Sequence, residues 1–120
     1  MHRIDKDTSG CLVIALRKSF LRKFHQEIRN KHVDKIYDLI VFGQWPDDIR
    51  SVNVPLSKKR SNSGEREAIV EKGGKDSLTE FQLVKSSKGF SQLRAKIITG
   101  RMHQIRAVSY THLTLPTNCV

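Results

Sequence analysis

The stretch KIYDLIVF, residues 35–42, mixes aromatic and β-branched residues and precedes a strong turn signal at residues 45–48. This composition is typical of a β-strand. Further along the chain, turn residues separate three more strand candidates, at residues 68–70, 77–84 and 90–98. The second half of the sequence therefore predicts several consecutive strands.

Two intermediate segments are less regular. Residues 52–56 predict a short edge strand, because Pro55 cannot donate a hydrogen bond within a sheet. Residues 57–65 are rich in lysine and serine and predict a polar loop. We expect this loop to separate the short edge strand from the strand at residues 68–70.

The first part of the chain predicts one strand and one helix. Residues 11–16 are almost wholly apolar and suit a strand buried on both faces. After them, helical spacing places four apolar residues on one face, which we expect to pack: Phe20, Leu21, Phe24 and Ile28. The order strand, helix, several strands predicts an α+β fold with a mixed, largely antiparallel sheet and packed helices.

Composition limits the size of the core and the class of partner. Among 120 residues, 38% are hydrophobic, which supports one modest core. The 22 Lys and Arg against 12 Asp and Glu leave a net charge of +10, which favours a polyanion such as nucleic acid. Basic residues recur in residues 17–29, 58–66 and 85–106, which indicates a folded basic surface rather than a tail. Generic solubility is the alternative reading of this charge.

The sequence also bears on location and cofactors. No apolar run is long enough for a membrane span, and no secretory signal opens the chain, so we expect a cytoplasmic protein without a membrane partner. Cys11 and Cys119 offer neither a disulfide framework nor a Cys-x-x-Cys site, and the five histidines are scattered. We therefore expect no metal.

Two motifs carry the candidate chemistry: HRIDKDTSG at residues 2–10 and TGRMHQIR at residues 99–106. The first places carboxylates among basic residues, and the second supplies guanidinium groups that could hold a carboxylate ionised. From the residues alone, Asp5 and Asp7 are equal candidates, because Asp7 could instead cap the turn that follows it. Tyr37, in a strand, is by itself typical of a core aromatic.

These motifs resemble those of the RluA-type pseudouridine synthases, in particular the C-type subgroup that modifies large-subunit ribosomal RNA. Five intermediate segments add to the resemblance, which covers residues 1 to about 107: residues 35–37, 43–45, 54–56, 63–66 and 74–81. The resemblance implies isomerisation of uridine to pseudouridine in RNA, most directly large-subunit ribosomal RNA, by an Asp-dependent mechanism without a cofactor.

The resemblance also implies catalytic roles. Asp5 matches the carboxylate that either attacks the sugar or base as a nucleophile or removes a sugar proton. Arg106 matches the arginine that pairs with this carboxylate and holds it ionised. Tyr37 matches the tyrosine that stacks on the target base and is a candidate for moving the C5 proton.

Two further arginines receive RNA-binding roles from the resemblance. Arg3 matches the residue that fills the gap left when the target uridine flips out of its stack. Arg101 is assigned to phosphate contact or support of the site. His103 is interpreted as a structural hydrogen-bonding residue and Trp45 as packing at a turn.

The chain departs from the family pattern at both ends. Family members carry a segment before the first motif and core strands after the second. Residues 108–117 instead match, letter for letter, a translated transposon-end sequencing adapter. We therefore expect residues 1–107 to be a partial catalytic domain, truncated at both ends, and residues 108–120 to be an artefact.

Truncation has consequences for the isolated fragment. Missing strands would leave edges and apolar faces uncovered, so we expect it to be poorly stable, prone to aggregate and inactive. The parent protein is expected to be a monomeric enzyme. The alternative is a catalytically inactive, basic RNA-binding fragment. A glycosidase is disfavoured, because Asp5 and Asp7 are too close in sequence to flank a sugar ring.

Overall fold

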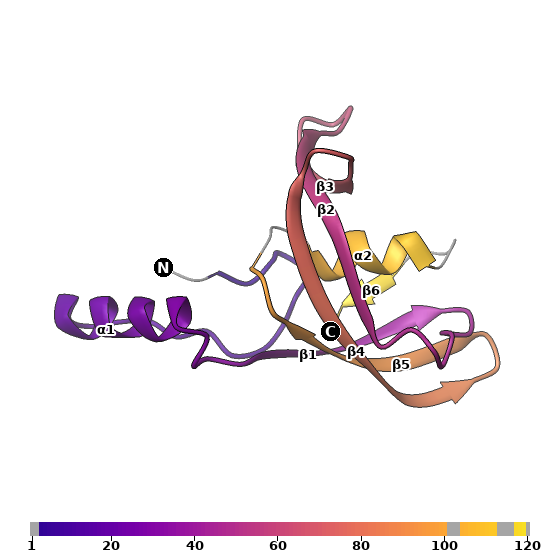
Figure 1. The fold of residues 1–120 in the computed structure, drawn as a ribbon, viewed down its shortest axis with the longest axis horizontal. Coiled ribbons are helices and arrows are strands. Elements are labelled where there is room, and N and C mark those ends of the chain that lie inside the picture. The colour runs from indigo at the N-terminus through magenta and orange to yellow at the C-terminus, as the bar shows by residue number, and fades with distance from the viewer. Residues whose placement is uncertain (1–2, 101–103, 113–116, 120) are drawn as a thin grey trace.

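The computed structural model describes residues 3–100, 104–112 and 117–119. It forms a curled sheet with one helix set against it and another held apart (Figure 1). The elements are, in chain order, α1 (Lys18–Arg29), β1 (Lys35–Phe42), β2 (Ser51–Arg60), β3 (Arg66–Val70), β4 (Lys75–Ser87), β5 (Phe90–Ile97), α2 (Gln104–His112) and β6 (Thr117–Cys119). The predicted α+β class is confirmed.

The described strands form one sheet in the order β3-β2-β4-β5-β1-β6, and every neighbouring pair is antiparallel. Leu93 lies opposite Leu39 on one side and Leu83 on the other. Because side chains alternate between the two faces of a strand, this register fixes which residues share a face. We call the face that carries Leu39 and Leu93 the inner face.

The core lies between the inner face and α2. Leu39, Val41 and Leu93 are at most 1% exposed, and Val108 of α2 is completely buried against them. Burial of such side chains is the main stabilising contribution in a domain of this size. The core therefore couples the position of α2 to the middle of the sheet.

Trp45 closes one end of this core. Its ring centroid lies 4.8 Å from that of Phe81, and its Nε1 donates a hydrogen bond to the Ile49 carbonyl at 3.1 Å. The backbone N–H of Trp45 donates to the Ser91 hydroxyl at 3.0 Å. The interpretation of Trp45 as packing at a turn is confirmed.

The outer face carries charged pairs. Arg94 Nε lies 2.7 Å from Asp38 Oδ1, and Lys96 Nζ lies 3.0 Å from Asp34 Oδ1. The hydrogen bonds from Arg94, aided by its charge, hold the pKa of Asp38 below its ordinary value. These side chains are about half exposed, so the pairs fix cross-strand neighbours and contribute little to stability.

β2 differs from its prediction in length and place. It is not a short edge strand, because it runs from Ser51 to Arg60 between β3 and β4. Pro55 is tolerated since pairing with β3 begins only at Leu56, and there the Pro55 carbonyl accepts a hydrogen bond from the Glu71 N–H at 3.1 Å. The predicted loop at residues 57–65 shrinks to a turn at residues 61–65.

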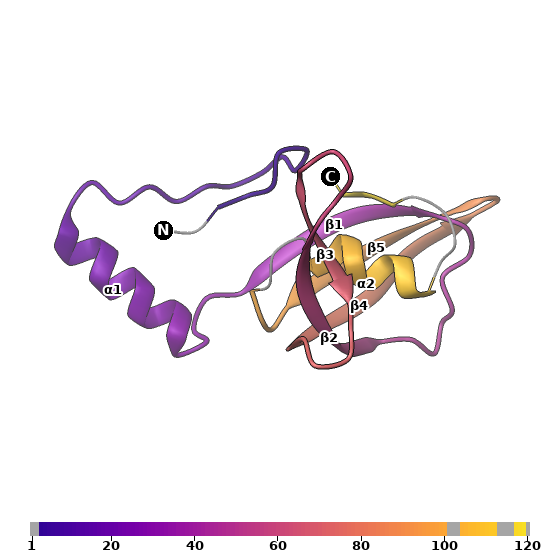
Figure 2. The same ribbon diagram turned by 90° about the horizontal axis from the view of Figure 1, so that it is seen from above.

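The predictions for the first apolar segment and its helix are corrected. Residues 11–16 form no strand, and Leu16 is 94% exposed. α1 forms as expected, but none of its residues is buried, although Phe20 and Phe24 stack at 6.0 Å. Both segments lie to one side of the sheet (Figure 2). Apolar patterning leads to burial only where a partner surface exists, and the described residues leave this surface uncovered.

The expected boundary after Ala107 falls inside α2. β6 pairs with β1 through residues 117–119, with Cys119 opposite Leu39. Val108, the first residue assigned to the adapter, is buried in the core. The assignment of residues 1–107 to a truncated domain and of residues 108–120 to an artefact stays a prediction.

Gly74 sets the packing of the turn between β3 and β4. A Cβ there would lie 2.6 Å from the Leu56 carbonyl carbon, so Gly74→Ala must push β2 and this turn apart. We expect it to lower the free energy of unfolding of the full-length protein by about 2 kcal/mol, measured by urea denaturation. Lys72→Ala, in the same turn and exposed, is the control and should change it by less than about 0.5 kcal/mol. Equal values for both variants would contradict the close packing.

Candidate active site

Asp5 lies in a turn near the start of the described chain. The backbone N–H of Thr8 donates to the Asp5 carbonyl at 3.0 Å, which places Asp7 at the centre of the turn. Arg3 and Asp5 are both exposed. The turn thus fixes the backbone at Asp5 and leaves this residue accessible to a ligand.

Tyr37 lies on β1, opposite Ala95 of β5. It is half-buried on the inner face and packs against the core cluster that contains Leu39 and Val41. A ring packed on one side and accessible on the other can present a flat surface to a base. Both readings of this residue, core aromatic and base-stacking tyrosine, are compatible with its position.

Gln104 anchors α2 to the sheet. Its Nε2 donates to the Leu78 carbonyl at 2.9 Å and to the Thr79 hydroxyl at 2.7 Å. Its Oε1 accepts a hydrogen bond from the Thr99 hydroxyl at 2.9 Å. The side chain is 2% exposed, and these bonds satisfy its buried amide. The position of α2 relative to β4 therefore depends on Gln104.

On α2, the described residues at the end of the second motif and just after it divide into buried and accessible ones. Gln104, Ile105 and Val108 are buried, whereas Arg106 is exposed. With about 100° of rotation per helical residue, Arg106 faces away from the packed side of α2. Its guanidinium is thus available to an anion while its backbone is held by the core.

Lys35 is a basic residue near this region that the sequence interpretation left without a role. Its Nζ would lie 2.8 Å from a Cβ placed on Gly100, so the lysine reaches the start of the second motif. Lys35 and Tyr37 share a strand face, because they are two residues apart on β1. In the sequence, Lys35 stood out only as part of the family-like segment KIY. Gln104 was missed because a motif glutamine gives no sign of its burial.

The structure describes the positions of some of the predicted site residues but not of all of them. Tyr37 and Arg106 are attached to the same core, through β1 and α2. Arg101 and His103 lie outside the described residues. The pairing of Asp5 with Arg106 stays a prediction, as do the roles of Arg3 and Arg101.

Membrane-spanning helices and metal sites are features that the described residues can be checked for directly. Neither α1 nor α2, as far as they are described, is long and apolar enough to cross a membrane. Within residues 3–100, 104–112 and 117–119, no three His, Cys, Asp or Glu side chains are grouped so that they could hold a metal ion.

Comparisons with known proteins give the family. The family described as RNA pseudouridylate synthase matches residues 1–110. Ribosomal large subunit pseudouridine synthase C of Buchnera aphidicola subsp. Baizongia pistaciae is 40% identical over 116 residues, which cover 97% of this chain and 36% of the relative. The protein of the same name from Escherichia coli strain K12 is 42% identical over 106 residues, which cover 88% of this chain and 33% of the relative. The chain thus spans about a third of the length of these relatives.

Solved structures show the same fold. The human protein RNA pseudouridylate synthase domain containing 4 has a TM-score of 0.75 at 24% identity, covering 97% of this chain and 48% of its own. The human protein RNA pseudouridylate synthase domain containing 1 has a TM-score of 0.74 at 23% identity. The match of the family over residues 1–110, nearly the whole sequence, shows that the chain belongs to the RNA pseudouridylate synthase family.

Proposed function

We propose that the protein containing this chain isomerises uridine to pseudouridine in large-subunit ribosomal RNA. The observation that carries the proposal is 40–43% identity to relatives named ribosomal large subunit pseudouridine synthase C, over stretches of 106 to 116 residues. The net charge of +10 agrees with an RNA substrate. Because those relatives are bacterial proteins named for the ribosome, we propose a cytoplasmic site of action. We also propose that the protein acts as a monomer.

The reaction exchanges one glycosidic bond for another. The bond between N1 of uracil and C1′ of ribose breaks, the base turns, and a bond forms between C5 and C1′. The C5 proton leaves and N1 gains a proton, so the atoms balance without an oxidant or a second substrate. One carboxylate and one group able to move a proton are enough for this chemistry.

We assign these roles to residues of the candidate active site. Asp5 acts as the carboxylate, either as a nucleophile or as the base that removes a sugar proton. Arg106 stabilises the ionised carboxylate, and Tyr37 stacks on the uracil and takes part in moving the C5 proton. The accessibility of Asp5 and Arg106 and the half-buried position of Tyr37 support these roles.

We assign RNA contacts to the remaining arginines. Arg3, two residues before Asp5 and exposed, fills the space left by the flipped uridine. Arg101 contacts phosphate or supports the site. Flipping costs a few kcal/mol of unstacking, and an inserted guanidinium recovers part of it by stacking on the neighbouring bases.

Tritium release tests the proposed function. The full-length protein is incubated with a large-subunit ribosomal RNA transcript carrying [5-³H]uridine. Because C5 loses its hydrogen when the new bond forms, tritium should enter the water in proportion to the pseudouridine formed. Transcript labelled at C6 is the control and should release none. Binding of the transcript without release from C5 would favour the binding-only alternative.

A further inference from the structure

Four cations share one face at the β2–β3 end of the sheet. In the β2–β3 register, Lys58 lies opposite Ala68 and Arg60 opposite Arg66, and Leu56 lies opposite Lys75 of β4. Alternation along each strand places Leu56, Lys58 and Arg60 on the same face, together with their partners. We call the surface of Lys58, Arg60, Arg66 and Lys75 the basic hairpin face.

The basic hairpin face is a continuation of the inner face. Leu56 is buried at 5% exposure on the core side of β2, and Lys75 follows the alternation of Ser77 and Thr79, both buried. The inner face is also the one on which Tyr37 and α2 lie. The basic hairpin face and Tyr37 therefore lie on the same side of the sheet.

The opposite face of the same hairpin has a different charge pattern. There Lys59 lies directly opposite Glu67, a pair of opposite sign. On the basic hairpin face, the described strand residues include no carboxylate. The ion pairs formed between two described residues have Glu27, Asp34 and Asp38 as their carboxylates, all outside the hairpin. Positive charge is thus left uncompensated on one face only.

This arrangement has a cost in stability. Like charges directly opposite each other in an antiparallel pair are destabilising, and Arg60 and Arg66 are such a pair. Both residues are exposed, so water reduces the repulsion without removing it. An anion bound between the two guanidinium groups would attract both of them and offset their mutual repulsion.

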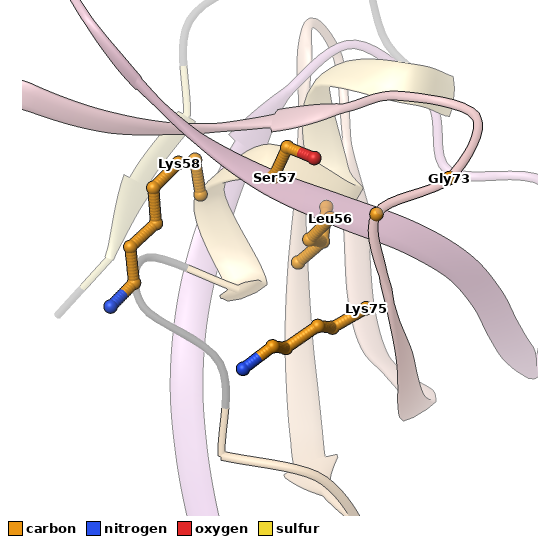
Figure 3. A pocket seen from close by; sticks show the side chains of 7 residues that line it. Leu56, Ser57, Lys58, Gly73 and Lys75 are labelled. Carbon is orange, nitrogen blue, oxygen red and sulfur yellow. The ribbon is translucent and has the colours of Figure 1, made fainter.

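A shallow, partly open pocket lies beside the hairpin. It has a volume of about 350 Å³ and is lined by Leu56, Ala68, the Gly73–Gly74 turn and the two lysines Lys58 and Lys75. Figure 3 shows the two lysine side chains extending to the same side of β2. Gly74 allows the turn to approach the Leu56 backbone, because a Cβ there would lie 2.6 Å from its carbonyl carbon.

We propose that the basic hairpin face binds phosphates of the RNA substrate beyond the target uridine, with Lys58 and Lys75 as the principal contacts. This inference rests on the proposed function for the identity of the RNA. Lysine and arginine side chains supply most contacts of proteins with nucleic-acid phosphates, and an uncompensated group of them is the electrostatic mark of such a surface. The surface would add affinity without reading sequence.

The test compares two double variants of the full-length protein, each of which loses two positive charges. The test variant carries Lys58→Gln and Lys75→Gln, and the control variant carries Lys59→Gln and Lys88→Gln. Lys59 lies on the opposite face of the hairpin and Lys88 in the turn between β4 and β5. Affinity for a large-subunit ribosomal RNA transcript is measured at several salt concentrations. We expect the first variant to lose about tenfold or more in affinity and to reduce the salt slope by about 1 for each lysine. The control pair should keep the slope of the unmodified protein.

Tritium release separates this inference from the proposed function. Equal losses of affinity in the two variants, with release intact in the unmodified protein, would overturn the phosphate contacts and leave the proposed function standing. A reduced slope in the first variant alone, without release by the unmodified protein, would support the contacts and overturn the function. Circular dichroism spectra matching those of the unmodified protein ensure that neither variant is misfolded.

Discussion

Asp5→Asn in the full-length protein is expected to lower the rate of tritium release from [5-³H]uridine-labelled transcript by about 10³-fold or more. The substitution keeps the size of the side chain and removes its charge, so it removes both a nucleophile and a base. Asp5 is exposed and fixed in its turn by a backbone hydrogen bond from Thr8. The change should therefore leave the fold and the affinity for RNA almost unaltered.

Asp7→Asn is the matched control for this prediction. Asp7 is exposed in the same turn, two residues from Asp5, and carries no role in the proposed chemistry. Its variant should release tritium at a rate within about twofold of the unmodified protein. If the two variants lost activity equally, the assignment of the carboxylate to Asp5 would be wrong, since the turn itself would be the sensitive feature. Single-turnover rates at saturating protein separate the chemical step from binding.

The strands were predictable where local pattern and burial agree. Residues 35–42, closed by a turn, form β1 with the predicted bounds, and residues 90–98 form β5 to within one residue. In both strands, alternate side chains pack in the core, so the pattern needed no information from elsewhere in the chain. The α+β class followed from the order of such segments.

The errors arise where the structure depends on distant partners. Pro55 predicts an edge strand only if the neighbouring strand that its nitrogen faces needs an N–H at that position. The Pro55 carbonyl accepts a hydrogen bond from Glu71 on the β3 side, so its nitrogen faces β3, and pairing with β3 begins one residue later. The apolar residues 11–16 and the apolar side of α1 predict burial, but burial requires a covering surface that the described residues do not provide. The pattern of a segment shows which of its side chains could be buried, but not whether another part of the structure covers them.

For the candidate site, the sequence predicts residues rather than their geometry, and the roles of these residues stay predictions. Family-like motifs singled out Asp5, Tyr37 and Arg106, and the fold places Tyr37 and Arg106 on elements of one core. Gln104 and the basic hairpin face were not found. Gln104 acts through its burial against β4, and the basic hairpin face arises from the register between β2 and β3. Neither burial nor register can be read from the order of residue types in the sequence.

Gln104→Leu is expected to lower the free energy of unfolding by about 3 kcal/mol and to reduce the rate of tritium release strongly. Leucine has a similar size but leaves the Leu78 carbonyl and the hydroxyls of Thr79 and Thr99 without the hydrogen bonds that Gln104 makes with them. Each buried polar group left without its partner costs about 1–3 kcal/mol. α2 would then lose its polar anchor to β4, and Arg106 would shift with it.

A double variant distinguishes this anchor from general packing. Thr79→Val removes one of the groups that Gln104→Leu leaves unsatisfied, so the two changes together should destabilise the protein by less than the sum of the single changes. Gln82→Leu, at an exposed position of β4, is the control and should alter stability by less than about 0.5 kcal/mol. Urea denaturation measures each value. Strict additivity of the two changes would mean that the Gln104 amide and the Thr79 hydroxyl do not act as a unit.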